Sequence, residues 1–385
     1  MRVFLEASRG GSVSAAAEQC NLSQPAATQA LSRLEADLGA TLLIRRRGQF
    51  ALTESGAVFE KRAAAALRHL SEGGRVASGR GPFGQSVTAA QLRNLIAIAN
   101  TGSFTVAART MGLSQPTVHR TARHLEALAG QPFFLASATG VQLTPAAEGF
   151  VRAVKLARSE IKMGVEEISQ ALGREKSSFV LGSLPLARTS IVPKAIHTLV
   201  TARRGVQVRV VDGRYSALLR ALREGDIDCL IGALRRPAPA EDVEERLLFR
   251  DALTLVAHPT HPLAQRPATL KDTLAYPWIA PPKETPAGQY LFETLRIQDR
   301  AETPVRAVSS SMAVLRGILA EGDYISVVSA HQVEADVNLG LIARLNIPLT
   351  GHIRHIGLTY RRDWRPTKTQ DLFIQYLSNH SPTSV

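Results

Sequence analysis

Cysteine, aromatic residues and long apolar runs are all scarce in this chain of 385 residues. The two cysteines, Cys20 and Cys229, belong to no C-x-x-C pair, which excludes a disulfide framework and a zinc ribbon. Aromatic residues make up 5%, too few for a single-strand nucleic-acid binder built on stacked rings. No apolar run reaches the roughly 18 residues of a membrane span, and the N-terminus lacks a secretory pattern. We therefore expect a cytoplasmic protein without a membrane partner.

Apolar and basic residues, by contrast, are plentiful. Hydrophobic residues make up 45% of the chain, enough for packed cores, and the length suits about two or three domains. Lysine and arginine number 46 against 33 acidic residues, which gives a net charge of +13. A surplus of this sign and size favours a polyanionic partner, most simply nucleic acid.

A segment near the N-terminus recurs 91 positions later without a gap. Leu22–Pro25 reads Leu-Ser-Gln-Pro and returns as Leu113–Pro116. Other identities at the same spacing pair Gly11-Ser12 with Gly102-Ser103, Ala16-Ala17 with Ala107-Ala108, Leu34-Glu35-Ala36 with Leu125-Glu126-Ala127, Gly39 with Gly130, Leu52-Thr53 with Leu143-Thr144, and Phe59 with Phe150. So many matches in one register predict a duplicated structural unit.

Each copy predicts two short helices joined by a tight turn. Asn21 and Gly112 suit a turn residue with positive φ. Ser23 and Ser114 are good N-caps, and each is followed by a proline in the first helical turn, where proline is tolerated. Because a short hairpin and then a long helix come next, each copy is expected to be a helix-turn-helix with a wing.

The pattern Ala-Ala, Leu-Ser-Gln-Pro, Leu-Glu, Leu-Gly and Leu-Thr resembles the winged helix-turn-helix of LysR-type transcriptional regulators. The resemblance implies that the second helix of the motif enters the major groove of promoter DNA and that a long linker helix follows. It further implies a C-terminal effector-binding domain similar to type 2 periplasmic binding proteins. Such a protein is a regulator and not an enzyme, and it needs no cofactor.

The expected fold is therefore two helix-rich winged helix-turn-helix units, a long linker helix, and an α/β effector-binding domain of two subdomains. The expected boundaries are 1–70 for the first unit, 71–86 for a flexible Gly-rich linker, 87–144 for the second unit, 145–174 for the linker and dimerisation helix, and 175–385 for the effector domain. Subdomain I is expected at 177–252 and 350–376, and subdomain II at 253–349.

The two copies differ where the family contacts DNA. The first copy has Gln29 where the second has Arg120, and the first has a basic wing at Arg45–Arg47 where the second has neutral Ala136–Ala138. Arginine reads guanine and glutamine reads adenine, so the copies could prefer different bases. The sequence leaves open whether both copies contact DNA or whether one only packs. The candidate DNA-binding residues are Ser23, Gln24, Pro25, Thr28, Gln29, Arg45, Arg46, Arg47, Ser114, Gln115, Pro116, His119 and Arg120.

The helix expected at 145–172 carries an apolar stripe with near-heptad spacing. Its members are Phe150, Val154, Ala157, Ile161, Val165, Ile168 and Leu172. Such a stripe predicts a homodimer through this helix and hence an inverted-repeat operator. A tetramer is a further expectation from the family resemblance.

The C-terminal half alternates buried strands with helices, which predicts an α/β sheet with ligand loops at the carboxyl ends of its strands. Hydroxyl and guanidinium groups in these loops suit a small organic acid or a sugar, although the serines could simply cap helices. The candidate effector-binding residues are Ser183, Leu184, Arg188, Thr189, Tyr215, Ser309, Ser310 and Ser311.

Neither catalytic nor metal-binding patterns are evident. His258 and His261 flank a proline-rich loop without an acidic or cysteine partner, so no metal is expected. The main hypothesis is a LysR-type regulator controlled by a small-molecule effector. The alternative is a small-molecule binding protein whose DNA-binding region is degenerate.

Overall fold

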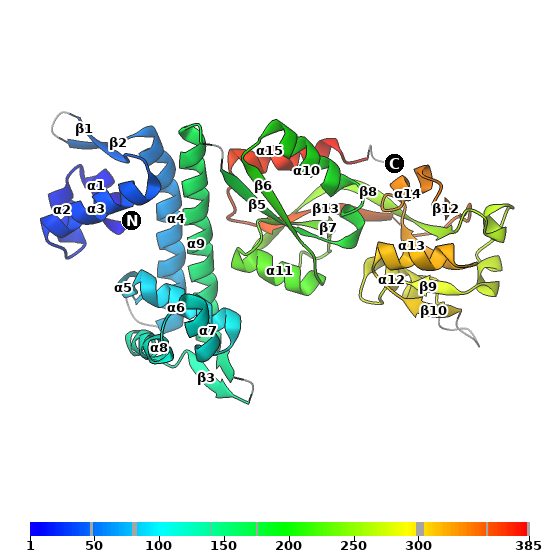
Figure 1. Ribbon diagram of the computed structural model, residues 1–385, viewed down its shortest axis with the longest axis horizontal. Coiled ribbons are helices and arrows are strands. Elements are labelled where there is room, and N and C mark those ends of the chain that lie inside the picture. The colour runs from blue at the N-terminus through cyan, green and yellow to red at the C-terminus, as the bar shows by residue number, and fades with distance from the viewer. Residues whose placement is uncertain are drawn as a thin grey trace. The chain divides into compact units, whose positions relative to one another are not determined.

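The computed structural model describes residues 1–46, 49–78, 83–138, 140–174, 176–297, 304–351 and 353–382. The chain divides into two compact units (Figure 1). The N-terminal unit comprises Met1–Ser177 with Arg223–Asp226, and the C-terminal unit comprises Ser178–Leu222 with Ile227–Val385.

The N-terminal unit contains the same order of elements twice. The first series is α1 (Arg2–Gly10), α2 (Val13–Gln19), α3 (Gln24–Leu38), β1 (Leu43–Arg46), β2 (Gln49–Leu52) and α4 (Glu54–Ser78). After α5 (Phe83–Ser86), the second series is α6 (Ala89–Thr101), α7 (Phe104–Met111), α8 (Gln115–Ala129), β3 (Phe134–Ser137), β4 (Gly140–Leu143) and α9 (Pro145–Ala171). In each series the two strands form an antiparallel hairpin, which is the predicted wing.

The predicted turn and caps are present in both series. The turn residues Asn21 and Gly112 have φ values of 54° and 67°, which is the left-handed conformation predicted for them. The Oγ of Ser23 accepts a hydrogen bond from the backbone N–H of Ala26, and the Oγ of Ser114 accepts one from Thr117, each at 3.4 Å. The identities between the copies therefore preserve the local signals that begin α3 and α8.

The two long helices, α4 and α9, pack against each other along their lengths, and they lie side by side in Figure 1. A Cβ atom added to Gly73 of α4 would collide with Ala153, near the start of α9. A Cβ atom added to Gly164, near the end of α9, would lie 3.1 Å from the Cβ of Arg62. The end of each helix thus faces the beginning of the other, so the pair is antiparallel, and glycines allow the close approach.

An ion cluster is buried between these helices. Nη1 of Arg62 donates to Oε2 of Glu160 at 3.0 Å, and Nη2 donates to Oε1 of Glu167 at 2.6 Å. Arg62 and Glu160 are each 5% exposed. Burial lowers the pKa of the guanidinium, but the hydrogen bonds and charge of Glu167 and Glu160 outweigh it and hold the pKa above its usual value. The arginine therefore stays charged and joins α4 to α9.

The expected flexible linker at 71–86 is corrected by this packing. Helix α4 continues to Ser78, and Gly73 is one of its contact residues against α9. On the far side of the gap, the Phe83 ring packs 4.9 Å from the Phe150 ring. Residues 79–82 lie outside the described part of the chain. Gly73, Gly74 and Gly84 serve close packing, because a Cβ atom at any of them would collide with a neighbouring residue.

Much of the 145–172 stripe, which is expected to pair two chains, packs within one chain. Phe150, Val154 and Ala157 of α9 are buried in one core with Ala66 and Leu70 of α4. This part of the stripe is therefore covered by α4 of the same chain, whereas Val165 and Leu172 of the stripe are exposed.

The C-terminal unit is built on one mixed sheet. Its strands are β5 (Ser177–Ser183), β6 (Val206–Val211), β7 (Cys229–Ala233), β8 (Val243–Ala257), β9 (Trp278–Ala280), β10 (Val305–Val308), β11 (Ile325–Ser329), β12 (Ala343–Arg344) and β13 (Ile353–Arg361). The strand order is β10-β9-β11-β8-β13-β7-β5-β6, and β12 pairs with β8. The long strands β8 and β13 pair antiparallel and connect two halves of the sheet. In one half β5 and β7 pair parallel, and in the other β9 and β11 pair parallel.

Helices cover the sheet in both halves. They are α10 (Ile191–Ala202), α11 (Tyr215–Glu224), α12 (Pro286–Gln289), α13 (Met312–Ala320), α14 (Glu334–Asn338) and α15 (Lys368–Asn379). Phe179 of β5 packs against Phe373 of α15 with ring centres 4.8 Å apart, whereas the next residue, Val180, packs in the cluster of Leu218 and Leu222 of α11. Alternate side chains of a strand point to opposite faces, so α15 and α11 cover different faces of this half.

Two glycine substitutions test the helix pairing. We expect Gly73→Ala to lower the free energy of unfolding, because its new methyl group collides with Ala153. Gly149→Ala in α9 is the control, since nothing lies within 4 Å of its added Cβ, and alanine should stabilise this exposed helical position by about 1 kcal/mol. Chemical denaturation of both variants checks the opposite signs. Equal effects of the two substitutions would contradict the close packing.

Candidate DNA-binding surface and effector site

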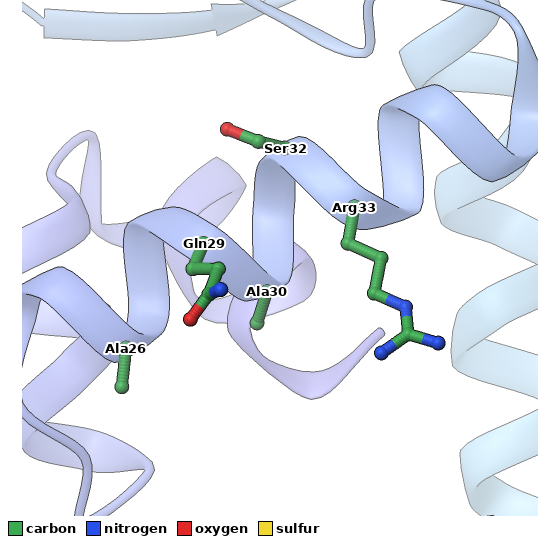
Figure 2. A pocket seen from close by; sticks show the side chains of 5 residues that line it. All are labelled: Ala26, Gln29, Ala30, Ser32 and Arg33. Carbon is green, nitrogen blue, oxygen red and sulfur yellow. The ribbon is translucent and has the colours of Figure 1, made fainter.

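The exposed side of α3 is the first candidate surface. An open pocket of about 560 Å³ is lined by Ala26, Gln29, Ala30, Ser32 and Arg33. Figure 2 shows Gln29 and Arg33 projecting from α3 on the side that carries Ala26 and Ala30. The inward residues Ala27 and Leu31 are buried, so α3 has one packed face and one free face.

The remaining predicted residues of this surface are exposed as well. Ser23, Gln24, Pro25 and Thr28 all lie at the solvent-exposed start of α3, where the hydroxyl of Thr28 donates to the Gln24 carbonyl at 3.0 Å. The first turn of α3 therefore offers polar side chains and its capped N-terminus together.

Helix α8 presents an equivalent but chemically different face. Ser114, Gln115, Pro116, His119 and Arg120 are all exposed. The ring of His119 lies 5.1 Å from the ring of Phe104 in α7, edge to face, which limits its freedom. Gln29 and Arg120, the predicted groove-facing residues at matching positions, both point away from their cores.

Two glutamates connect these helices to their wings, and sequence reasoning did not assign them a role. Oε1 of Glu35 in α3 accepts hydrogen bonds from the backbone N–H groups of Leu42 and Leu43 at 2.7 and 3.2 Å. Oε1 of Glu126 in α8 does the same for the matching wing strand, at 2.8 and 3.0 Å. Each carboxylate fixes its wing relative to its helix. The signal was present in the sequence, because both glutamates belong to the repeated Leu-Glu-Ala.

The wings differ as the sequence indicated. Arg46 is exposed on β1, whereas the matching strand β3 ends in Ala136 and Ser137. Arg47 and the side chain of Arg45 lie outside the described part of the structure.

The candidate effector residues after β5 lie in one connected loop. Ser183 is fully buried, and Leu184 begins the loop at the carboxyl end of the strand. The hydroxyl of Thr189 donates to the Gln332 carbonyl at 2.8 Å, which brings the loops after β5 and β11 together. Nη1 of Arg188 lies 3.3 Å from Asp212, while its buried Nε has no hydrogen-bond partner in the described structure.

The other candidates occupy different surroundings. The Arg235 guanidinium lies 4.6 Å above the centre of the Tyr215 ring, and burial raises the pKa of the Tyr215 hydroxyl. Ser311 is the N-cap of α13 and accepts from the Val314 N–H at 3.4 Å. Within the described residues, no hydrogen bond or ion pair joins 309–311 to the loop after β5. The capping role considered for these serines is thus present at Ser311.

A buried polar cluster beside the Thr189 contact was not foreseen from the sequence. Asp251 of β8 forms an ion pair with Arg354 of β13 and accepts a hydrogen bond from the Ser329 hydroxyl at 2.8 Å. The neighbouring His331 packs on the ring of Phe249 at 5.3 Å, and burial lowers its pKa. No local pattern could reveal this cluster, because its members come from strands about 80 to 100 residues apart.

The histidines of the proline-rich loop, His258 and His261, form local hydrogen bonds. Nδ1 of His261 accepts from the Leu263 N–H at 3.0 Å, and His258 contacts the hydroxyl of Thr260 at 2.7 Å. Throughout the described ranges, no three His, Cys, Asp or Glu residues group as metal ligands would. Helices that could cross a membrane are likewise absent from those ranges.

Comparison with known proteins identifies the class. The sequence model for the LysR substrate binding domain matches residues 172–382, and the model for the bacterial regulatory helix-turn-helix protein, lysR family, matches 1–57 and 89–148. These matches cover most of the chain. The protein is a DNA-binding transcriptional regulator with an effector-binding domain, and it belongs to the LysR family. Regulators of this family bind promoter DNA and small-molecule effectors and act as oligomers.

Individual relatives agree with this assignment. The HTH-type transcriptional regulator GalR of Pseudomonas putida is 31% identical over 363 residues, which are 94% of this chain and 91% of the relative. That alignment is long enough to include both segments matched by the helix-turn-helix model. The HTH-type transcriptional regulator PcaQ of Agrobacterium fabrum is 27% identical over 76% of this chain and 94% of its own length. The relatives are regulators, so the chain is not an enzyme.

Solved structures share the fold. A full-length OxyR variant from Pseudomonas aeruginosa aligns with a TM-score of 0.53 at 20% identity, over 76% of this chain and 97% of its own. CbnR, a LysR family transcriptional regulator, aligns with a TM-score of 0.52 at 20% identity, over 77% of this chain and 100% of its own.

Two carboxylate substitutions in α3 test the role of Glu35. We expect Glu35→Ala to lower the free energy of unfolding by about 1–3 kcal/mol, because two backbone N–H groups of the wing lose their acceptor. Asp37→Ala, an exposed carboxylate on the same helix, should change it by less than about 0.5 kcal/mol. Thermal or urea unfolding measures both. Similar losses in the two variants would refute the wing-fixing role.

Proposed function

We propose that α3 and α8 are both recognition helices, each reading bases in the major groove of promoter DNA. The observation that carries the proposal is that both helices have a free polar face on the same scaffold, capped by Ser23 or Ser114 and fixed to a wing by Glu35 or Glu126. Base contacts are assigned to Gln29 and to Arg120, because amide and guanidinium groups match adenine and guanine edges.

The remaining candidates position the protein on DNA. The exposed N-terminal turns at Ser23–Pro25 and Ser114–Pro116 suit phosphate groups, since helix N-termini attract anions. Thr28 and His119 lie one turn further along their helices. The basic wing at Arg45–Arg47 would hold phosphates of one half of the operator, and the neutral wing of the second copy would not.

We also propose that the effector carries a carboxylate, as in an organic acid, or sugar hydroxyls, and binds at the loop after β5. The buried and unpartnered Nε of Arg188 supports an anion, because a buried donor without an acceptor is costly. Ser183, Leu184 and Thr189 belong to the same loop. Ser309–Ser311 are proposed as the opposing side of the site, and Tyr215, which stacks with Arg235, is the weaker candidate.

The Thr189 contact supports a way in which the effector could control the protein. The bond to Gln332 joins loops on either side of the crossing strands β8 and β13. A ligand that binds this loop better in one arrangement of the two halves would shift the population towards that arrangement, which is all that allosteric control requires.

Two arginine substitutions separate base reading from phosphate binding. We expect Arg120→Ala to weaken binding to the preferred site about tenfold or more and to relax the preference at one base pair. Arg46→Ala should weaken preferred and scrambled DNA alike and reduce the salt dependence. Fluorescence anisotropy with both duplexes over a range of salt measures this. Equal losses on the two duplexes for Arg120→Ala would refute its base contact.

Point variants are the appropriate test, because removal of the first copy would damage the second. Ala66, Leu70 and Ala77 of α4 belong to the core that surrounds Phe133 and Phe150. A wild-type protein that fails to bind DNA even at low salt would favour the alternative of a degenerate DNA-binding region.

The effector proposal is tested by titration calorimetry with acetate, succinate, benzoate and glucose. We expect at least one carboxylate to bind and Arg188→Ala to weaken that binding about tenfold or more. Arg209→Ala, an exposed arginine on β6, is the control and should bind as wild type does. Undiminished carboxylate binding by Arg188→Ala would overturn the assignment.

A further inference from the structure

We propose that one chain is a complete two-site DNA reader, in which the α4–α9 pair replaces the pairing of two chains. Its operator then consists of two different half-sites in a fixed order and not of an inverted repeat. The inference rests on the proposed function, namely that α3 and α8 both contact DNA. It replaces the expectation of a homodimer through the 145–172 helix.

The first argument is the internal symmetry of the helix pair. A Cβ atom added to Gly73 of α4 would meet Phe150 and Ala153 of α9, and one added to the matching Gly164 of α9 would meet Phe59 and Arg62 of α4. In each case the matching positions are 91 residues apart. The two contacts are therefore related by a local twofold axis, as in a symmetric dimer, although both helices belong to one chain.

The cores follow the same symmetry. Ile168, near the end of α9, is buried in the core of the first copy, which also contains Phe4 and Phe59. Ala77, its counterpart in α4, is buried in the core of the second copy. Each copy thus needs the other's long helix to complete its core, and the second helix is supplied within the chain.

The second argument is a buried ion cluster that breaks this symmetry. Arg62 of α4 pairs with Glu160 and Glu167 of α9, but the counterpart of Arg62 in α9 is Ala153. Two α9 helices paired in the same way would bury Glu160 without any guanidinium. Two α4 helices would bury Arg62 beside His69 and Val76 in place of the carboxylates. A buried charge without its partner is strongly unfavourable, so the ion cluster selects α4–α9 over either self-pairing.

The third argument concerns the recognition faces. The scaffold residues Ser23, Glu35 and Gly39 recur unchanged as Ser114, Glu126 and Gly130. All five residues that line the α3 pocket differ from their counterparts in α8. The pairs are Ala26 and Thr117, Gln29 and Arg120, Ala30 and Thr121, Ser32 and Arg123, and Arg33 and His124. Two faces of different chemistry on one scaffold predict two different half-sites.

Pairing within one chain is tested by pulsed dipolar spectroscopy on the full-length protein. Spin labels are placed at Arg68→Cys in α4 and Val165→Cys in α9, both exposed, after Cys20→Ser; Cys229 is buried and remains. We expect a short distance between the two labels. Its modulation depth should stay unchanged when labelled chains are diluted tenfold with unlabelled ones. A depth that falls about in proportion to the dilution means that the helices pair between chains, and it overturns the inference.

The operator is tested by selection from random duplex DNA with the full-length wild type, Gln29→Ala and Arg120→Ala. We expect wild type to enrich two different half-sites in one order, each variant to relax one of them, and the two variants to affect opposite halves. An inverted repeat, or both halves relaxed by Arg120→Ala, overturns the inference. If only one half-site is enriched and the modulation depth is unchanged by dilution, the proposed role of one recognition helix is refuted, but the pairing within one chain stands.

Discussion

The buried contact of Arg62 with Glu160 and Glu167 is the interaction on which the N-terminal unit depends. A guanidinium that is 5% exposed needs its carboxylates, and those carboxylates need it. The cluster fixes which face of α4 meets which face of α9. Since each long helix also completes the core of the other copy, the relative placement of α3 and α8 follows from this one pairing.

The residues that recur between the two copies and the residues that differ have different roles in the structure. Residues that recur unchanged are caps, turn glycines and the glutamates that fix the wings, which every such scaffold needs. The five residues that line the α3 pocket all differ from their counterparts in α8, and most of them are solvent-exposed, where folding imposes little constraint. Under the proposed function, a duplication that keeps the first set and varies the second retains the DNA-binding shape while the two proposed recognition faces diverge.

The C-terminal unit also contains an ion pair between segments that are distant in the chain. Its crossing strands β8 and β13 are locked by the buried pair of Asp251 and Arg354, and Ser329 and the Thr189 contact with Gln332 lie next to it. Under the proposed function, the loop with the unpartnered Arg188 nitrogen offers a place for an anion, and the Thr189 contact offers a route by which its binding reaches the two halves.

The sequence by itself determined the local structure. Ser23, Ser114, Asn21 and Gly112 predicted the turns and caps of both copies, because their preferences act within a few residues. The tertiary structure decided the partners. Glycines near residue 73 suggest a flexible linker or a close helix contact equally well, and only the presence of Ala153 distinguishes them. The apolar stripe of α9 predicted a partner helix but did not identify it. The ion pair of Arg62 with Glu160, 98 residues later, favours a partner helix within the same chain. Contacts between segments so distant in the chain depend on the assembled fold, which no local pattern encodes.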